Sequence, residues 1–322
     1  MVHARLPNIQ FTLSHVVRLT CGARNDSLQE VENVLTIYSS VTARRGLLAG
    51  ALVLSGLAAS AVAQGGVTIY GVTTSDRLVQ FNSASPCMVS NPIKISGLDG
   101  NERVLGIDFR PATGQLYALG SSSQLYTINL STAVATPVGA PLTPALEGTA
   151  FGVDFNPTVD RLRIVSNTGQ NLRVNPDTGI AIVDGPLAYA TGDENFGIQP
   201  EVAGVAYTNP DRDPATLTEL LDIDVDLDIL AQQNPANSGT LLTRGSLNLG
   251  TNDLLGFDIA LLNGMNVGYA AMKIVGQGGG RNCGNSSLVQ VDLATGAATV
   301  VNGIGTQQPI TGLAVYIPPP SQ

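Results

Sequence analysis

Short apolar runs alternate with turn-forming residues along most of the chain, between residues 67 and 317. The clearest example, over residues 151–183, has the apolar runs FGVDF, RLRIVS, NLRVN and IAIV separated by NPTVD, NTGQ and PDTG. Runs of this length separated by Asn-Pro, Thr-Gly and Asp-Thr-Gly are typical of antiparallel hairpins. Because no sustained helical period occurs in this region, the pattern predicts an all-β fold.

A glycine-led apolar motif recurs five times along this region. The copies are LGIDF at 105–109, FGVDF at 151–155, AGVAY at 203–207, LGFDI at 255–259 and TGLAV at 311–315. Except after the last copy, further strand-like runs follow each motif. Four strands in roughly 50 residues is the repeat length of a β-propeller blade.

The two ends of the pattern complete each other. Residues 67–98 supply three strands that no glycine-led strand precedes, and residues 310–317 supply one glycine-led strand that nothing follows. Joined in one blade, they remove exposed sheet edges from the ring. We expect a five-bladed β-propeller of four-stranded antiparallel blades over residues 64–317, closed by the C-terminal strand; a two-sheet sandwich is the alternative. The expected blades are 310–317 with 67–98, 103–140, 149–185, 201–248 and 254–304.

Residues 1–63 have a different character and predict a targeting segment. Arg44 and Arg45 precede an apolar run that ends in Ala61-Val62-Ala63, the small-residue pattern of a signal-peptidase site. We expect cleavage after Ala63 and a periplasmic or extracellular protein, exported by the general secretory route. A folded-export route and a buried core helix are the alternatives, and the run is short for a membrane span.

The two ends of the chain lie outside this scheme. Residues 1–40 do not fit in front of a signal peptide, so translation from Val41 and an unusually long pre-region both stay open. Residues 318–322 predict a short disordered tail. We expect no membrane insertion after removal of the signal peptide.

Composition narrows the possible chemistry. Five of the 16 Lys and Arg residues and three of the 25 acidic residues precede residue 64, which leaves 11 and 22 and a net charge of −11. Nucleic acid and anionic membranes are therefore poor partners. Both histidines, His3 and His15, also precede residue 64, which excludes histidine-dependent nucleophiles and histidine-ligated metals from the remainder.

Two cysteines, Cys87 and Cys283, remain after residue 63. A pair of cysteines in an exported chain suggests a disulfide, with two unpaired thiols as the alternative. Cys283 follows the second predicted strand of its blade, and Cys87 follows the third strand of the neighbouring blade. Those loops leave opposite ends of an up-and-down blade. A bridge therefore requires the glycine-rich loop 275–287 to fold down the outside of the ring.

Three segments resemble a known family. GIDFRPATGQLYALG at 106–120, GVDFNPTVDRLRIVSNTGQNLRVNPDTG at 152–179 and AYTN at 206–209 are similar to the secreted bacterial domain of unknown function 4394. The resemblance extends over residues 67–317. It implies an exported, propeller-like protein, and it implies no activity.

Three repeats carry an aspartate two residues after the repeat glycine: Asp108, Asp154 and Asp258. Ala206 and Ala314 take this place in the other two repeats. Because the first strand of a blade is usually innermost, the three carboxylates would line the central channel. Hard cations take oxygen ligands, so the trio predicts a Ca²⁺ or Mg²⁺ site, with no other cofactor. The alternatives are that each aspartate accepts backbone N–H bonds from a neighbouring blade, or lines a water-filled channel.

The acidic residues also permit glycoside hydrolysis, which needs two carboxylates roughly 5–10 Å apart and no histidine. Four acidic residues precede inner strands and would lie at one channel opening: Glu102, Glu147, Glu201 and Asp253. The catalytic candidates for an enzyme are Asp108, Asp154, Asp258, Glu147 and Glu201. The lack of Trp, the few aromatic residues and the absence of a long insertion argue against a sugar cleft.

We therefore expect a monomeric binding or interaction module whose ligand is an unidentified protein or glycan. Propellers support many functions on one fold, so the fold does not choose among them. A carboxylate-dependent glycoside hydrolase is one alternative, and a structural envelope or matrix protein is another. We assign no catalytic residue for the binding function.

The stretch LDIDVDLDIL at 221–230 alternates aspartates with apolar residues, so a single strand would place four carboxylates on one face. Aligned by repeat, Asp224 takes the place of residues that end the third strand of other blades, namely Asn129, Asn175 and Asp292. The alignment predicts Asp222 in a strand, Asp224 at the end of a third strand, and Asp226 and Asp228 in a solvent-exposed hairpin turn.

Overall fold

The computed structural model describes residues 66–211, 213, 215–275 and 283–318. The expected signal peptide and its cleavage site, most of the glycine-rich loop and residues 319–322 lie outside this set. Within the set, no helix is long and apolar enough to cross a membrane.

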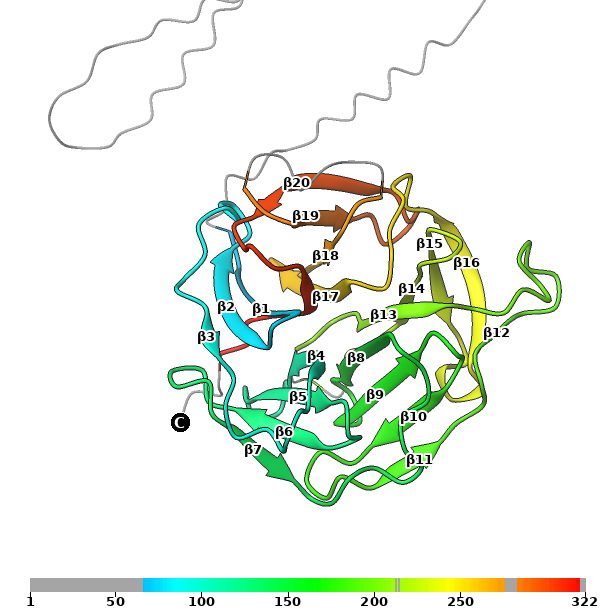
Figure 1. The fold of residues 1–322 in the computed structure, drawn as a ribbon. Helices are drawn as coiled ribbons and strands as arrows, with labels where there is room; N and C mark the ends of the chain where they lie inside the picture. The colour runs from blue at the N-terminus through cyan, green and yellow to red at the C-terminus, as the bar shows by residue number, and fades with distance from the viewer. Residues whose placement is uncertain (1–65, 212, 214, 276–282, 319–322) are drawn as a thin grey trace, which may run out of the picture. The chain divides into compact units, whose positions relative to one another are not determined.

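Five β-sheets are arranged as blades around a common centre (Figure 1). Blade 1 comprises β21 (Ile310–Val315), β1 (Thr68–Thr73), β2 (Arg77–Asn82) and β3 (Ile93–Lys94). Blade 2 comprises β4 (Val104–Phe109), β5 (Leu116–Gly120), β6 (Leu125–Ile128) and β7 (Ala135–Val138). Blade 3 comprises β8 (Phe151–Asn156), β9 (Arg161–Ser166), β10 (Asn171–Val174) and β11 (Ala181–Val183).

Blades 4 and 5 complete the ring. Blade 4 comprises β13 (Val202–Tyr207), β14 (Leu220–Asp224), β15 (Ile229–Gln233), β16 (Thr240–Ser246) and the added β12 (Ala188–Tyr189). Blade 5 comprises β17 (Leu255–Leu262), β18 (Met265–Met272), β19 (Ser286–Val291) and β20 (Ala298–Ile304). The predicted five-bladed propeller is confirmed. Blade 4 differs from the expected four strands because β12 pairs in parallel with the outer edge of β16.

The ring closes as the sequence predicts. The C-terminal strand β21 is antiparallel to β1, with Val315 opposite Ile69. One residue further on, Tyr316 N donates a hydrogen bond to Thr68 O at 2.9 Å. The two ends of the propeller therefore lie in the same blade.

The repeat glycines allow neighbouring inner strands to approach each other. A Cβ atom on Gly152 would lie 2.7 Å from Val205 N, and one on Gly256 would lie 2.4 Å from Leu313 N. Both distances are too short for a real contact, and the obstructing atoms belong to the backbone. The repeated glycine is thus a requirement of close packing at the centre of the ring.

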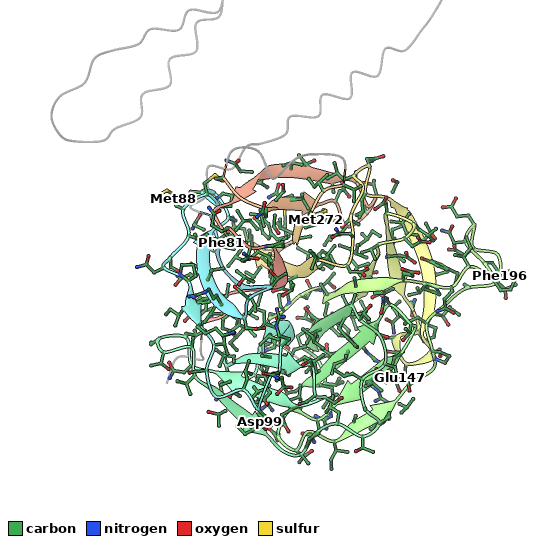
Figure 2. The ribbon with its side chains drawn as sticks, in the orientation of Figure 1. Phe81, Met88, Asp99, Glu147, Phe196 and Met272 are labelled. Carbon is green, nitrogen blue, oxygen red and sulfur yellow. A yellow bond between two sulfur atoms is a disulfide. The ribbon has the colours of Figure 1, made fainter. Side chains whose placement is uncertain are left out.

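The apolar core lies between adjacent sheets. In one cluster, Leu221 and Ile223 of blade 4 are buried with Phe257 and Met272 of blade 5. Figure 2 labels Met272 of this cluster. Burial of this kind is the main force that holds β-sheets face to face. The blades therefore form a rigid frame for the side chains at the centre and at the ends of the ring.

The acidic stretch 221–230 forms one strand, a turn and the start of the next strand. Asp222 and Asp224 lie on β14, whereas Asp226 and Asp228 lie in the turn before β15. The turn therefore interrupts the apparent row of four carboxylates. Asp226 is exposed, but Asp228 is only partly exposed and accepts a hydrogen bond from Thr251 N at 2.7 Å.

The strand assignment of Asp224 was wrong. β14 is the second strand of blade 4, not the third. The connection between β13 and β14 spans residues 208–219, whereas the corresponding turn of blade 3 spans residues 157–160. An alignment by repeat length counts this long connection as an additional strand and shifts every later element by one.

Candidate functional site

The three repeat aspartates converge at the centre of the ring. Asp108, Asp154 and Asp258 are 4%, 4% and 5% exposed, and a carboxylate oxygen of each lies within 4.8 Å of the others. They come from the inner strands β4, β8 and β17. The repeat position, two residues after the glycine, is what brings them together.

Each aspartate accepts a hydrogen bond from the inner strand of the next blade in the ring. The pairs are Asp108 Oδ2 with Phe155 N at 2.7 Å, Asp154 Oδ1 with Tyr207 N at 3.1 Å, and Asp258 Oδ2 with Val315 N at 2.6 Å. All three donors occupy the same repeat position, three residues after the glycine. The carboxylates therefore link neighbouring blades.

Two blades have no repeat aspartate, and the backbone N–H of the blade that follows each of them binds an aspartate of its own strand instead. Ala314 and Ala206 offer no carboxylate to the next inner strand. There, Phe109 N instead donates to Oδ1 of its own neighbour Asp108 at 2.7 Å, and Ile259 N donates to Asp258 Oδ1 at 2.5 Å. Three carboxylates thus bind one backbone N–H in each of five blades, and Oδ2 of Asp154 receives none of these five bonds.

Burial changes the acidity of this cluster. Desolvation raises the pKa of Asp108 and of Asp154 well above the usual range, and the neighbouring carboxylates add to both shifts. Desolvation also raises the pKa of Asp258 to about 7. Like charges in a low-dielectric site favour protonation of part of the group, so the trio holds protons near neutral pH.

The trio has the donor atoms of a hard-cation site. Ca²⁺ takes carboxylate oxygens at about 2.3–2.6 Å, so two ligands of one ion lie at most about 5 Å apart, and the observed spread fits that range. The same oxygens already accept backbone N–H bonds, which is the structural role that the sequence left open. Cation binding at Asp108, Asp154 and Asp258 therefore stays a prediction.

Calorimetric titration tests the cation prediction. At about pH 8, where more of the trio is ionised, Ca²⁺ is expected to bind with one ion per chain, and Asp154→Asn is expected to weaken binding at least tenfold because it removes one anionic ligand. Asp253→Asn, at an exposed carboxylate outside the trio, is the control. No heat with either Ca²⁺ or Mg²⁺ would exclude the metal site.

The cavity at the repeat glycines, near the trio, is small. Its volume of about 10 Å³ is room for about one water molecule. Its lining includes the five repeat glycines Gly106, Gly152, Gly204, Gly256 and Gly312. A sugar does not fit into this space.

The glutamates expected near the channel opening do not join the trio. Glu147, which Figure 2 labels, and Glu201 are both exposed, and in the described part of the chain neither belongs to a compact cluster of three acidic groups. Partial desolvation raises the pKa of Glu201, and the charges of Asp226 and Asp253 add to it.

Glu102 is buried, whereas an acidic residue at the channel opening would be exposed to solvent. It is 8% exposed and accepts hydrogen bonds from Ser122 N at 2.9 Å, from Ser122 Oγ at 2.6 Å and from the Tyr126 hydroxyl. These bonds hold the turn between β5 and β6. Glu102 is therefore part of the blade 2 framework.

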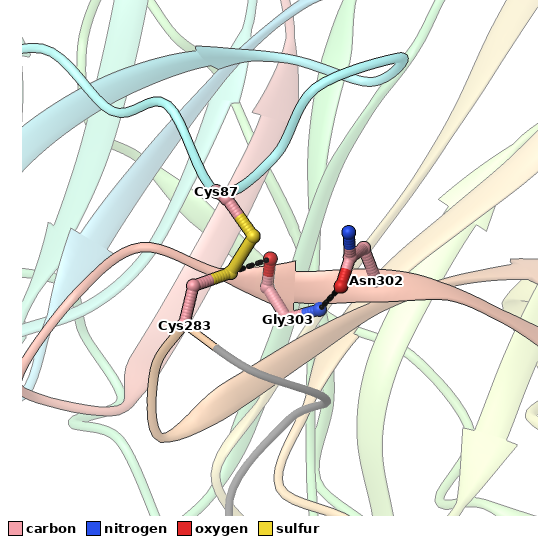
Figure 3. The surroundings of a disulfide bond; sticks show 4 residues. All are labelled: Cys87, Cys283, Asn302 and Gly303. Carbon is pink, nitrogen blue, oxygen red and sulfur yellow. Dashed lines mark hydrogen bonds between the residues drawn. A yellow bond between two sulfur atoms is a disulfide. The ribbon is translucent and has the colours of Figure 1, made fainter.

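Cys87 and Cys283 are joined in a disulfide with a Cα–Cα distance of 5.6 Å (Figure 3). The connection after β2 turns back along its own strand, because Val89 pairs with Phe81 and Ser90 N donates to Gln80 O. This path brings Cys87 beside the end of β20, where Gly305 N donates to Pro86 O. The connection between β2 and β3 therefore lies next to Cys283. The sequence had suggested that only the loop 275–287 would change its path to form the bridge.

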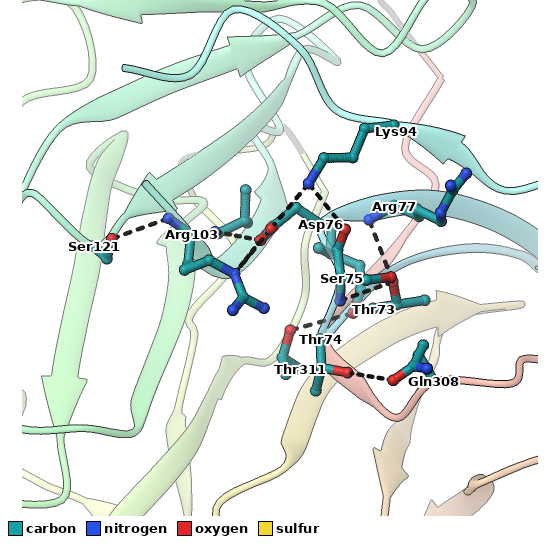
Figure 4. A network of polar contacts seen from close by, with 12 residues as sticks. Thr73, Thr74, Ser75, Asp76, Arg77, Lys94, Arg103, Ser121, Gln308 and Thr311 are labelled. Atoms are coloured by element: carbon teal, nitrogen blue, oxygen red, sulfur yellow. Dashed lines mark hydrogen bonds and ion pairs between the residues drawn. The ribbon is translucent and has the colours of Figure 1, made fainter. Parts of the chain in front are cut away.

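A buried aspartate that the sequence argument missed joins blades 1 and 2 (Figure 4). Asp76 is 4% exposed, and its carboxylate lies 2.8 Å from Arg103 Nε and 3.2 Å from Lys94 Nζ. It also accepts a hydrogen bond from Val104 N at 3.0 Å. The carboxylate of a β1–β2 turn therefore holds the start of β4.

Larger cavities lie away from the centre, and two of them exceed 400 Å³. One, of about 510 Å³, is lined by residues of blade 1 and by 305–308, including Thr73, Arg77 and Gln308 (Figure 4). The other, of about 470 Å³, lies between blades 3 and 4. Its lining residues are Asn156, Val159, Arg161, Arg163, Arg173, Tyr207, Pro235, Ala236 and Asn237.

The sequence did contain a signal for the second cavity. Arg161 and Arg163 alternate on β9, and Arg173 on β10 lies directly opposite Arg163 in the antiparallel pair. Residues at alternate and opposite positions share one face of a sheet. A search for repeated acidic residues overlooks this basic face.

The solved structures that match this chain include two of unknown function. One from Bacteroides caccae is 11% identical, and the match covers 77% of this chain and 98% of that chain with a TM-score of 0.38. A nidogen/laminin complex contains a chain that is 12% identical, with 79% and 99% covered and a TM-score of 0.45. A protein of unknown function from Bacteroides thetaiotaomicron is 13% identical, with 77% and 63% covered and a TM-score of 0.39.

No curated protein matches the chain. The family model described as domain of unknown function (DUF4394) matches residues 77–314, which include four of the five blades and the remaining strands of the first from β2 onward. The chain therefore belongs to the family described as domain of unknown function (DUF4394).

Proposed function

We propose that the protein is an exported binding module that takes its ligand in a cavity between blades and not in the central channel. The observation that carries this proposal is the contrast in volume between about 10 Å³ at the centre and about 470 Å³ between blades 3 and 4. Sites for small molecules usually measure about 300–1,000 Å³.

The state of the central carboxylates supports binding over hydrolysis. A retaining or inverting glycosidase needs one carboxyl group to donate a proton and another to attack or to activate water, and both must reach the sugar. Asp108 and Asp258 instead use both oxygens to accept backbone N–H bonds. Their burial leaves no space for a glycosidic bond between them.

A combined binding and turnover assay separates the two functions. The purified protein is expected to bind ligands on a glycan array and to release no reducing sugar from the glycans it binds. Asp154→Asn is expected to leave array binding unchanged, because an amide still accepts the Tyr207 N–H bond. Release of reducing sugar that Asp154→Asn or Asp108→Asn abolishes would replace the binding proposal with a hydrolase.

A protein with neither binding nor turnover would instead match the structural envelope alternative. Export itself is part of the proposal. N-terminal sequencing of protein from the periplasm or the medium is expected to begin at Gln64, directly after Ala63.

A further inference from the structure

The cavity between blades 3 and 4 is a positively charged pocket in an acidic protein. The whole chain has a net charge of −9, yet three arginine side chains line this one space. Among the described residues that line it, none is acidic. Local charge of one sign in a concave site concentrates ligands of the opposite sign.

Arg163 forms the fixed floor of the pocket. Its side chain is 1% exposed, and it donates to Asn171 Oδ1 at 2.6 Å, Asp184 Oδ2 at 2.7 Å and Asn237 Oδ1 at 2.8 Å. Its Nε also lies 3.4 Å from the Tyr207 hydroxyl. Partners from both blades therefore hold the guanidinium in place before any ligand arrives.

One carboxylate serves two of the three arginines. Arg173 donates from Nε to Asp184 Oδ2 at 2.7 Å and from Nη2 to Asp184 Oδ1 at 3.0 Å. Asp184 is also the ion-pair partner of Arg163. Two guanidinium groups thus share one carboxylate. Desolvation raises the pKa of the buried Asp222 well above its usual range, and it outweighs the charge of nearby Arg163, which lowers that pKa.

Arg161 adds a third positive charge, which binds no carboxylate directly among the described residues. The pKa of the Asp177 carboxyl is lowered by its hydrogen bond from Arg110, and Arg161 lies close enough to help lower it. Its only side-chain hydrogen bond among the described residues goes from Nη1 to the carbonyl oxygen of Asp160, at 2.8 Å. Within the described part of the chain it forms no ion pair, whereas the carboxylate of Asp160 is paired with Arg110 at 2.5 Å. The outer N–H groups of Arg161 are therefore available to a ligand.

The walls of the pocket are also hydrogen-bonded across the two blades. Asn171 Nδ2 donates to Gly185 O at 2.9 Å and to Ala236 O at 3.1 Å, which holds the short 3₁₀ helix Ala236–Ser238 against blade 3. The side chains of Asn156 and Asn237 bring amides to the lining. A prearranged site of this kind binds with a smaller loss of conformational entropy.

We propose that this pocket binds a small ligand through an oxyanion group, a carboxylate or a phosphate. The planar guanidinium groups of Arg161 and Arg173 match such groups in geometry and charge. The lining amides and Tyr207 bind the neutral part of the ligand. This inference rests on the proposed binding function and specifies the place and the chemistry of the ligand.

Titration calorimetry at low salt tests the inference with three probes: galacturonate, inorganic phosphate and neutral galactose. Galacturonate or phosphate is expected to bind, galactose is not, and the preferred probe distinguishes a carboxylate from a phosphate ligand. Arg161→Gln is expected to weaken binding at least about tenfold because it removes a charged hydrogen-bond donor. Added salt weakens the interaction further.

Arg244→Gln is the matched control, since Arg244 lies on blade 4 outside the cavity and, among the described residues, forms an ion pair with the exposed Glu219 alone. Equal loss in the Arg161 and Arg244 variants, or no heat with either anion, would overturn the pocket inference. If Arg161→Gln abolished anion binding while array binding was unchanged, the pocket would be the anion site and the array ligand would bind at a second site. If array binding persisted without any anion binding, the binding module would stand and its ligand would lie elsewhere.

Discussion

Replacement of Cys87 and Cys283 by serine is expected to lower the free energy of unfolding by up to about 5 kcal/mol at 25 °C. The bridge joins residues separated by 196 positions, so its loss releases a long loop in the unfolded chain. In the chain-entropy account, the constraint on the unfolded state grows with the logarithm of this length. Equilibrium denaturation in guanidinium chloride, followed by a spectroscopic signal of the β-sheets, measures the change.

Two observations make this test decisive. Intact mass under non-reducing conditions is expected to be about two mass units below that of the reduced protein, which establishes the bridge before the comparison. Reduction of the wild type is expected to reproduce the stability of the double serine variant. A difference below about 1 kcal/mol would contradict the chain-entropy account for this bridge, and would mean that residual structure in the unfolded chain or strain in the folded state offsets the constraint.

The stability of the protein is expected to fall by several kcal/mol as the pH rises from about 5 to about 8. Burial raises the pKa of Asp258 to about 7, whereas an aspartate in the unfolded chain titrates near its ordinary value of 3.8. Between these values the folded state holds more protons than the unfolded state, so stability decreases with increasing pH. The stabilisation is complete below the unfolded pKa and is lost as the pH passes the folded pKa. A shift of this size corresponds to about 4 kcal/mol for one group.

Thermal unfolding across this pH range measures the effect. Asp154→Asn is expected to flatten the decline, because an amide keeps the bond to Tyr207 N and removes a charge beside Asp108 and Asp258. Asp253→Asn, at an exposed carboxylate, is the matched control and should follow the wild type. Identical slopes in the wild type and Asp154→Asn would show that the trio does not govern the pH dependence.

The ring was predictable because its construction repeats. Close approach of inner strands requires glycine at one position in each blade, and Gly152 and Gly256 show why no side chain is tolerated there. The same repeat placed Asp108, Asp154 and Asp258 together at the centre. Their bonds to the next blade join equivalent repeat positions. The repeat therefore predicts both the fold and the central cluster.

Features that break the repeat were not predictable in the same way. The long connection 208–219 moved Asp224 from the expected third strand to the second. The two-residue strand β12 has no periodic pattern of its own, and it pairs with β16 only because the chain crosses between blades there. The arginine pocket depends on which faces of blades 3 and 4 meet, and repeat spacing does not specify that contact.

The position of the two ends of the propeller determines how the ring responds to mechanical load. In the pair β1–β21, the start of β1 lies beside the end of β21, since Ile69 is opposite Val315. A force that pulls both ends apart therefore breaks the ladder one hydrogen bond at a time, which resists far less than shearing all the bonds together. The bridge between Cys87 and Cys283 lies outside this pair and joins blade 1 to blade 5. When the strand pair is peeled open under tension, that covalent link still keeps the first blade attached to the fifth.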